Sequence, residues 1–238
     1  MHSHLLSKVP NIQHAFQTKD DSRPTDLTSC KQVHGKVVLH VKDNPSAELR
    51  NIPADGLLTK NSYCVGIQTA DCIPALFAEV SGRVIAAVHA GWRGLAEGIL
   101  VETVELFKRE GVTPQNLVIA IGPAIGPCCF EVGNEVIESF QEKWGHLWSR
   151  GSEPWQKYPS KNVHSKLSKA PETSNGLWLH LDQLARLQLV SCGLLDHHIE
   201  DVGTCTYCGP ESFASYRRAT NEKKSAARQW SWIKKMKS

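Results

Sequence analysis

Two apolar runs joined by a two-residue turn constrain this chain more than any other feature. Residues 73–80 (IPALFAEV) and 83–90 (RVIAAVHA) are short and apolar, and only Ser81 and Gly82 separate them. This pattern is typical of a β-hairpin. Other segments of similar length are also expected to be strands: residues 36–42, 64–70, 116–122, 198–205 and 227–233. The core is therefore predicted to contain β-sheet.

Between these strands, apolar residues recur at the spacing of an α-helix. The periodicity predicts three helices, over residues 95–110, 130–144 and 179–193. Residues 149–176 are polar and hold three prolines, which indicates a long surface-loop insertion. Strands and helices alternate irregularly. This favours a mixed α+β fold, with mixed sheets covered by helices in one domain over residues 1–238.

Composition excludes several classes of protein. With 41% hydrophobic and 21% charged residues, the chain has the balance of a globular protein without membrane spans. The first residues make a poor signal peptide, so we expect the protein in the cytoplasm. The eight cysteines are scattered, and in a reducing compartment they are expected to be thiols or metal ligands. The net charge is +3, but eight Lys or Arg and one acid fall within residues 217–238. The remainder is acidic, so we expect no nucleic-acid partner.

Three metal-ligand residues stand beside or at the ends of the predicted strands: His34, Cys72 and His89. Two imidazoles and one thiolate can hold zinc and leave a fourth position open, which is the pattern of a catalytic site. Their spacing along the chain is too wide to be a short motif. On the residues alone, a small apolar core residue is the commoner role for a cysteine such as Cys72.

Six segments in fixed order resemble the motifs of one family: KQVHG, ADGLLT, TADCIPALF, AAVHAGWRG, GPAIGPCCFEVGNEV and FASYRR. The resemblance covers roughly residues 30 to 233, and several motifs in order are far more specific than one. The chain is similar to the laccase-domain family. This family is also called the YfiH family of purine nucleoside phosphorylases, and its members were earlier described as polyphenol oxidases.

The resemblance implies a fold and an activity. The fold would be a layered sandwich of two central mixed β-sheets flanked by helices, related to the catalytic domain of the cytotoxic necrotizing factor toxins. His34, Cys72 and His89 would bind the metal, with zinc expected and copper a weaker alternative. The activity would be phosphorolysis of adenosine, inosine or methylthioadenosine, accompanied by deamination of adenosine. The partners would be a purine nucleoside and phosphate, with the chain a monomer or homodimer.

Further residues receive expected roles from their motifs. Arg93, ahead of a helix, would bind phosphate, while Trp92 is open between stacking on a purine and packing in the core. Asp71 would orient a ligand or move a proton, unless it points the other way. Arg217 and Arg218 are the candidate arginine pair for substrate binding: one would reach phosphate, while the other would pair with an acid such as Glu131. Gln32 is a candidate contact to base or ribose.

The chain also departs from the family pattern. The family's Thr-Arg-x-Gly-Gly loop is not readable before His34, so the chain either lacks the arginine of that loop or substitutes Arg23 for it. SAAR replaces a Thr-Gly-Arg turn. Cys128 and Cys129 are expected to pack in the core. Cys205 and Cys208 form a lone C-x2-C pair, for which no structural zinc is expected because a second half is missing.

Three other functions remain open at this point. Cys72 with His89 as its base would suit an amide hydrolase. A copper polyphenol oxidase needs several His-x-His pairs, and the sole one here is His2–His4. A protein that keeps the metal but has no turnover is the last alternative.

Overall fold

A six-stranded mixed sheet forms the centre of the computed structural model, which describes residues 1–42, 47–160 and 176–236. Its strand order is β12-β8-β6-β7-β4-β3. The strands are β3 (Val38–Val41), β4 (Gly56–Thr59), β6 (Ile73–Glu79), β7 (Ile85–Ala90), β8 (Leu117–Ile121) and β12 (Ile199–Asp201). β6 and β7 are antiparallel, with Ile73 opposite Ala90, which confirms the predicted hairpin.

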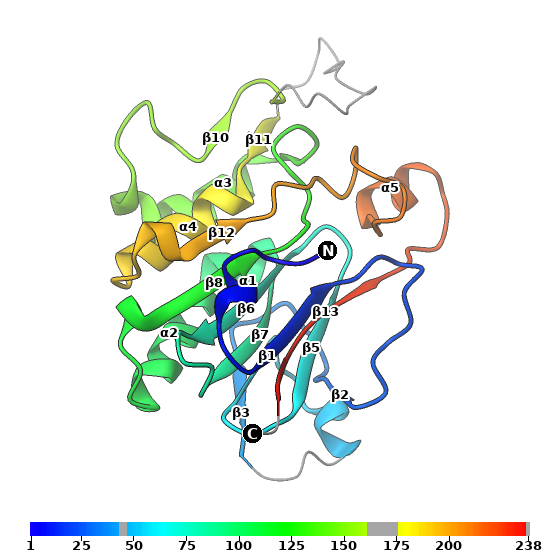
Figure 1. Cartoon of the computed structure of the whole chain (residues 1–238). Helices are drawn as coiled ribbons and strands as arrows, with labels where there is room; N and C mark the ends of the chain where they lie inside the picture. Colours follow the sequence, from blue (N-terminus) through cyan, green and yellow to red (C-terminus); the bar gives the residue numbers. More distant parts are fainter. Residues whose placement is uncertain (43–46, 161–175, 237–238) are drawn as a thin grey trace.

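A four-stranded mixed sheet lies beside it, in the order β1-β13-β5-β2. Its strands are β1 (Ile12–Phe16), β2 (Leu27–Thr28), β5 (Cys64–Thr69) and β13 (Gln229–Lys235). β13, near the C-terminal end of the described chain, pairs with β1 on one side and with β5 on the other. The first and last parts of the chain therefore lie side by side in one sheet (Figure 1).

Alternate residues of the central strands face two different cores. Leu76 and Ala78 of β6 belong to the core between the two sheets, where they join Phe16, Ile67 and Ile233. Ile73, Ala75 and Phe77 of the same strand belong to the core shared with the helices. The period of two in a strand explains this division. The molecule thus has three layers: the smaller sheet, the larger sheet, and the helices α1 to α4 (Figure 1).

The helices are α1 (Trp92–Glu97), α2 (Ile99–Arg109), α3 (Asn134–Trp144), α4 (Leu181–Ser191) and α5 (Tyr216–Asn221). Short 3₁₀ helices span Leu6–Lys8, Ala47–Asn51, Pro114–Asn116, Gly145–Leu147 and Asp196–His198. The helix predicted over residues 95–110 is wrong as a single element. Gly98, with φ of 93°, adopts the left-handed conformation and separates α1 from α2.

The predicted helix over residues 130–144 begins only at Asn134, because β9 (Glu131–Val132) precedes it. β9 pairs with β11 (Leu177–Leu179), and β11 pairs with β10 (Trp155–Gln156). This third small sheet was not expected, and β10 falls within the predicted surface loop 149–176. Residues 161–175 of that loop lie outside the described residues, so the insertion and the single-domain assignment stay predictions.

The mixed sheets covered by helices agree with the predicted fold class, while the relation to the toxin domain stays a prediction. Within the described residues, no helix is long and apolar enough to cross a membrane. β7 pairs antiparallel with both β4 and β6. The last residues of β7 therefore lie beside the first residues of those two strands. The residues at these strand ends form the candidate site.

Candidate active site

The structure brings His34, Cys72 and His89 together. Their ligand atoms all lie within 4.8 Å of one another, and the two imidazole ring centres are 4.7 Å apart. His89 is the last residue but one of β7, and Cys72 stands immediately before β6. The antiparallel register of these strands places the two residues side by side. The predicted juxtaposition is confirmed, and the role of these residues as metal ligands stays a prediction.

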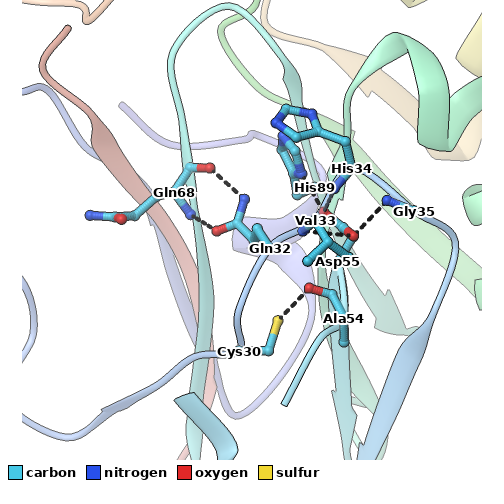
Figure 2. Close-up of polar contacts among 9 residues, drawn as sticks. All are labelled: Cys30, Gln32, Val33, His34, Gly35, Ala54, Asp55, Gln68 and His89. Atoms are coloured by element: carbon cyan, nitrogen blue, oxygen red, sulfur yellow. Dashed lines mark hydrogen bonds and ion pairs between the residues drawn. The ribbon is translucent and has the colours of Figure 1, made fainter. Parts of the chain in front are cut away.

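Asp55, the residue immediately before β4, positions two members of this cluster, His34 and His89, through hydrogen bonds (Figure 2). One carboxylate oxygen lies 2.8 Å from Nδ1 of the buried His89. The carboxylate also accepts hydrogen bonds from the backbone N–H groups of Val33, His34 and Gly35, at 3.2, 2.9 and 2.7 Å. Burial alone would raise the pKa of Asp55, but these bonds outweigh it and lower that pKa. Asp55 therefore remains an anion that holds both His89 and the loop of His34.

The ionisation of the cluster favours a thiolate. Burial raises the pKa of Cys72, but hydrogen bonds with His34 and His89 outweigh it and lower the pKa to about 7. Burial lowers the pKa of His89, and its bonds with Asp55 and Cys72 outweigh that effect and raise the pKa to about 9. At neutral pH the thiol is therefore ready to lose its proton, which metal binding and nucleophilic attack both require.

The donor set and its surroundings fit a metal ion. A bond between His89 Nδ1 and a carboxylate leaves Nε2 for a metal, which is the usual arrangement of a metal-binding histidine. A Cβ atom at Gly91 would lie 2.9 Å from Nδ1 of His34 and 3.0 Å from Sγ of Cys72. Glycine at this position thus keeps open the space between the donors. His34 itself has a left-handed backbone, with φ of 61°, a conformation that non-glycine residues rarely adopt.

Asp71 joins the cluster to the far end of the chain. Its backbone is also left-handed, with φ of 82°, and its carboxylate is buried. One carboxylate oxygen accepts from the Thr206 hydroxyl at 2.6 Å, and the other accepts from the backbone N–H of Arg217 at 2.7 Å. Both oxygens are therefore engaged with protein donors. Its predicted part in catalysis stays a prediction, and the observed contacts are those of a residue that positions Arg217.

A cavity of about 450 Å³ contains the three clustered residues. Its lining residues are Gln32, His34, Gln68, Thr69, Ala70, Asp71, Cys72, His89, Trp92, Arg93, Ile125, Phe130, Leu181, Tyr216, Arg217, Ala226 and Arg228. The lining thus combines guanidinium groups with aromatic rings beside the possible metal ligands. A cavity of this size suits a small molecule.

The arginines of the FASYRR motif have different surroundings. Arg217 lines the cavity, lies over the Phe130 ring and donates to the backbone carbonyl of Glu131. Arg218 is absent from the lining, and its guanidinium donates to the backbone carbonyls of Thr206 and Tyr207. The structure therefore places Arg217 at the cavity and Arg218 away from it. A contact of either residue with substrate stays a prediction.

Arg93 and Trp92 both line the cavity. The Arg93 guanidinium lies 4.3 Å from the centre of the Trp92 ring, and Trp92 also packs against the core of the helices. Among the described residues, Arg93 makes no ion pair, so its charge is available at the cavity. Arg23, the possible substitute for the family's arginine, is not among the lining residues and stacks on Trp230 instead.

Gln32 also lines the cavity, but its amide is already bonded to the protein (Figure 2). Its Nε2 donates to the backbone carbonyl of Gln68 at 2.8 Å, and its Oε1 accepts from the backbone N–H of the same residue at 2.8 Å. These two bonds tie the His34 loop to β5. The predicted contact to base or ribose stays a prediction.

Sequence reasoning missed several residues of the site. Asp55 is part of the ADGLLT motif, which was its only signal. Arg228 in SAAR lines the cavity although that turn departs from the family pattern. Cys128 and Cys129 pack against the core of the helices, as expected. The expectation that the Cys205–Cys208 pair lacks a second half is wrong. The sulfur atoms of these four residues all lie within 4.8 Å of one another.

Comparisons with known proteins identify relatives of this chain. A family described as "Multi-copper polyphenol oxidoreductase laccase" matches residues 7–235. The purine nucleoside phosphorylase YfiH of Escherichia coli is 38% identical over 196 residues, which are 82% of this chain and 70% of the relative. The purine nucleoside phosphorylase PA4543 of Pseudomonas aeruginosa is 35% identical over 214 residues, 87% of this chain and 77% of the relative.

A solved structure shares the fold as well. The crystal structure of YlmD from Geobacillus stearothermophilus has a TM-score of 0.72 and 31% identity, covering 89% of this chain and 74% of that one. These matches confirm the resemblance that the six motifs indicated. The chain belongs to the laccase-domain family, together with relatives that are named purine nucleoside phosphorylases.

Proposed function

We propose that this protein is a zinc-dependent purine nucleoside phosphorylase that also deaminates adenosine. One observation carries the proposal: the His34, Cys72 and His89 cluster opens into the same cavity as three arginines and three aromatic side chains. The names of the relatives, purine nucleoside phosphorylases, support the phosphorylase activity. We place the enzyme in the cytoplasm, where its thiols stay reduced, as a monomer or homodimer.

His34, Cys72 and His89 would hold the metal, with Asp55 orienting His89. Three protein ligands leave one position open, and a zinc ion in such a site supplies a Lewis acid beside the substrate. Copper is the weaker choice because a multicopper oxidase needs many more histidine pairs than this sequence offers. The Lewis acid would face the cavity, since the three ligands line it.

Arg93, Arg217 and Arg228 supply cations for phosphate. Guanidinium groups bind phosphate through parallel charged hydrogen bonds, and these three line one cavity. In phosphorolysis, a phosphate oxygen bonds to C1′ of the ribose as the bond from C1′ to the base breaks. Base and ribose 1-phosphate leave, and the phosphate must be held in line with that bond. The arginines would provide this hold.

Trp92, Phe130 and Tyr216 supply flat surfaces for the base. All three line the cavity, and Tyr216 is largely exposed, as a residue at the rim would be. Aromatic rings stack on purines regardless of their substituents. This arrangement supports a purine as substrate without distinguishing adenosine, inosine and methylthioadenosine. Deamination of adenosine needs the same base site, since water adds at C6 and ammonia leaves.

Chromatography of the products of adenosine tests the activity. The purified protein is incubated with adenosine, with and without inorganic phosphate. Adenine and ribose 1-phosphate that form only with phosphate establish phosphorolysis, and inosine that forms in both reactions establishes deamination. Unchanged adenosine in both reactions contradicts the proposal and favours a protein that binds metal without turnover.

The metal assignment has a separate test. Cys72→Ala should lose the metal at this site and both activities, whereas Cys192→Ala should lose neither. Cys192 follows α4 and belongs to neither cluster of possible ligands among the described residues. Equal metal content in Cys72→Ala and the unmodified protein contradicts the assignment.

A second candidate function is amide hydrolysis with Cys72 as the nucleophile. The observation that favours it is the row formed by Cys72, His89 and Asp55, in which the thiol bonds to His89 and His89 bonds to the carboxylate. This is the order of nucleophile, base and orienting acid in cysteine hydrolases. Amide cleavage that persists after metal removal, and is lost in Cys72→Ser, would support this function over the first.

A further inference from the structure

We propose that Cys128, Cys129, Cys205 and Cys208 bind a structural zinc ion at a second site. Their sulfur atoms all lie within 4.8 Å of one another, and those of Cys128 and Cys208 are 3.5 Å apart. Zinc bound to four thiolates at about 2.3 Å places the sulfurs about 3.8 Å from each other. The cluster therefore already has the dimensions of a tetrahedral zinc site.

Backbone pairing, and not only side-chain orientation, brings the two halves together. Cys128 and Cys129 lie in the loop after β8, and Cys205 and Cys208 lie in the loop after β12. Ala124 and Cys205 form a parallel bridge, in which Ala124 donates to the Thr204 carbonyl and accepts from the Thr206 N–H. The parallel strands β8 and β12 lead directly into this bridge. The convergence thus follows from the fold of the larger sheet.

The second half of the cluster forms a tight turn that keeps its two cysteines close together. The backbone N–H of Gly209 donates to the carbonyl of Cys205 at 2.9 Å, which closes the turn that contains both cysteines. A side chain at residue 209 would collide with that same carbonyl, so the turn requires glycine. The backbone N–H of Gly126 donates to Sγ of Cys205 at 3.3 Å. Such N–H to sulfur bonds stabilise a thiolate, which is the form that binds metal.

The surroundings provide charge compensation for a bound ion. Four thiolates and one Zn²⁺ carry a net charge of −2. The Arg218 guanidinium donates to the carbonyls of Thr206 and Tyr207, the two residues between Cys205 and Cys208. The cation therefore lies on the cysteine turn itself. This contact accounts for its position away from the cavity, and it balances part of the charge that zinc binding creates.

The donor set favours zinc over a multi-iron cluster or a disulfide. Four soft thiolates with no oxygen or nitrogen donor suit zinc, and four protein ligands leave no open position, as in structural sites. A cluster with several iron atoms needs its thiolates farther apart than these are. A disulfide requires an S–S length of about 2.05 Å, well below the 3.5 Å between Cys128 and Cys208. Binding releases the thiol protons to solvent and forms four Zn–S bonds.

The position of this site indicates what it does. Thr206, between the two cysteines of the turn, donates to Asp71, and Ile125 donates its N–H to the Asp71 carbonyl at 2.9 Å. Asp71 precedes Cys72 and also accepts from the N–H of Arg217. Zinc would therefore hold together the two loops that position Asp71. Because Asp71 lines the candidate active site, the zinc would also stabilise that wall of the cavity. This inference does not depend on the proposed catalytic activity.

Metal analysis of matched variants tests the proposal. Four proteins are purified without added metal and dialysed: the unmodified chain, Cys72→Ala, Cys205→Ser/Cys208→Ser and the control Cys192→Ser. Cys72→Ala should retain about one zinc per chain, as four protein ligands bind tightly. X-ray absorption of the zinc in this variant should show four sulfur neighbours at about 2.3 Å and no nitrogen neighbour. The double serine variant should lose this zinc, and Cys192→Ser should keep it.

The Cys72→Ala measurements decide the question even if the double serine variant fails to fold. Zinc with four sulfur neighbours in Cys72→Ala supports the proposal. A Cys72→Ala protein without zinc, with iron in its place, or with nitrogen or oxygen neighbours overturns it. Failure of the catalytic metal assignment has a different signature, because unmodified protein and Cys72→Ala would then hold equal amounts of zinc.

Discussion

Nδ1 of His89 lies 2.8 Å from Oδ1 of Asp55, and the two side chains are only 3% and 0% exposed to solvent. The same carboxylate accepts the N–H groups of Val33, His34 and Gly35. A single buried anion thus orients one proposed ligand through its ring and another through its backbone. A metal site with such support depends on the second layer of contacts as well as on the ligands.

Asp55→Asn should weaken the catalytic metal site without removing any ligand. The amide keeps an oxygen for the backbone donors but loses the negative charge that favours His89 in its observed orientation. Loss of such a partner typically costs about 10- to 100-fold in metal affinity, which competition with a chromophoric chelator measures. Glu79→Gln is the control: it changes a buried acid at the opposite end of β6 and should leave the metal affinity unchanged. Unaltered affinity in Asp55→Asn would contradict the proposed role.

Gly91→Ala should displace the ligands by direct contact. Its Cβ would lie 2.9 Å from Nδ1 of His34 and 3.0 Å from Sγ of Cys72, closer than atoms normally approach. His34 is exposed and can move away, so the fold should persist while about one metal equivalent is lost. Gly35→Ala is the matched control, because its nearest new contact would be an ordinary 3.7 Å. Full metal content in Gly91→Ala would show that the space between the donors is not needed.

His14 should make stability depend on pH. Burial, followed by the nearby His2, lowers the pKa of His14 from 6.5 to about 4, and its Nε2 accepts the N–H of Ser3 at 2.8 Å. The unfolded chain takes up a proton near pH 6.5 and the folded chain only near pH 4. The stabilisation is therefore complete above pH 6.5 and is lost as the pH falls toward 4, by about 2 kcal/mol at pH 5.

Urea unfolding of the wild type, His14→Gln and His197→Gln at pH 7 and pH 5 measures this dependence. Glutamine at residue 14 retains an acceptor for Ser3 but does not titrate, so this variant should lose less stability between the two pH values. His197 is exposed, and its replacement should leave the dependence as in the wild type. Identical pH dependence in all three proteins would contradict the assignment to His14.

The features that could be predicted from sequence depend on local signals or on whole motifs. The hairpin of β6 and β7 was predictable because its turn joins the two runs directly. The pairing of β1 with β13 was not, since nothing in either segment specifies a partner at the other end of the chain. The division at Gly98 was hidden because the apolar periodicity continues on both sides of one left-handed residue.

In the candidate site too, residues with local or motif signals could be predicted, and those defined by long-range contacts could not. His34, Cys72 and His89 stood out as strong ligands at strand ends, and the family motifs grouped them. Asp55 carried no signal beyond its place in the ADGLLT motif, because its importance lies in contacts with residues from two other segments. The tetracysteine cluster was missed because each half is incomplete alone, and only the parallel pairing of β8 with β12 unites them.

Arg93 provides the most direct test of phosphate binding. Its guanidinium lies over Trp92 and, among the described residues, has no ion-pair partner, so Arg93→Ala should lose only about 0.5–1 kcal/mol of stability. Phosphate would lose charged hydrogen bonds, which raises the KM for phosphate about 10- to 100-fold. Arg93→Lys keeps the charge but not the two parallel hydrogen bonds of a guanidinium, so its KM for phosphate should rise less.

Deamination, which needs no phosphate, should be nearly unaffected in both variants. Arg83→Ala, at the opposite end of the β6–β7 hairpin, is the control with unchanged kinetics. A wild-type KM for phosphate in Arg93→Ala, or an equal decline of both activities, would require a different residue for the anion.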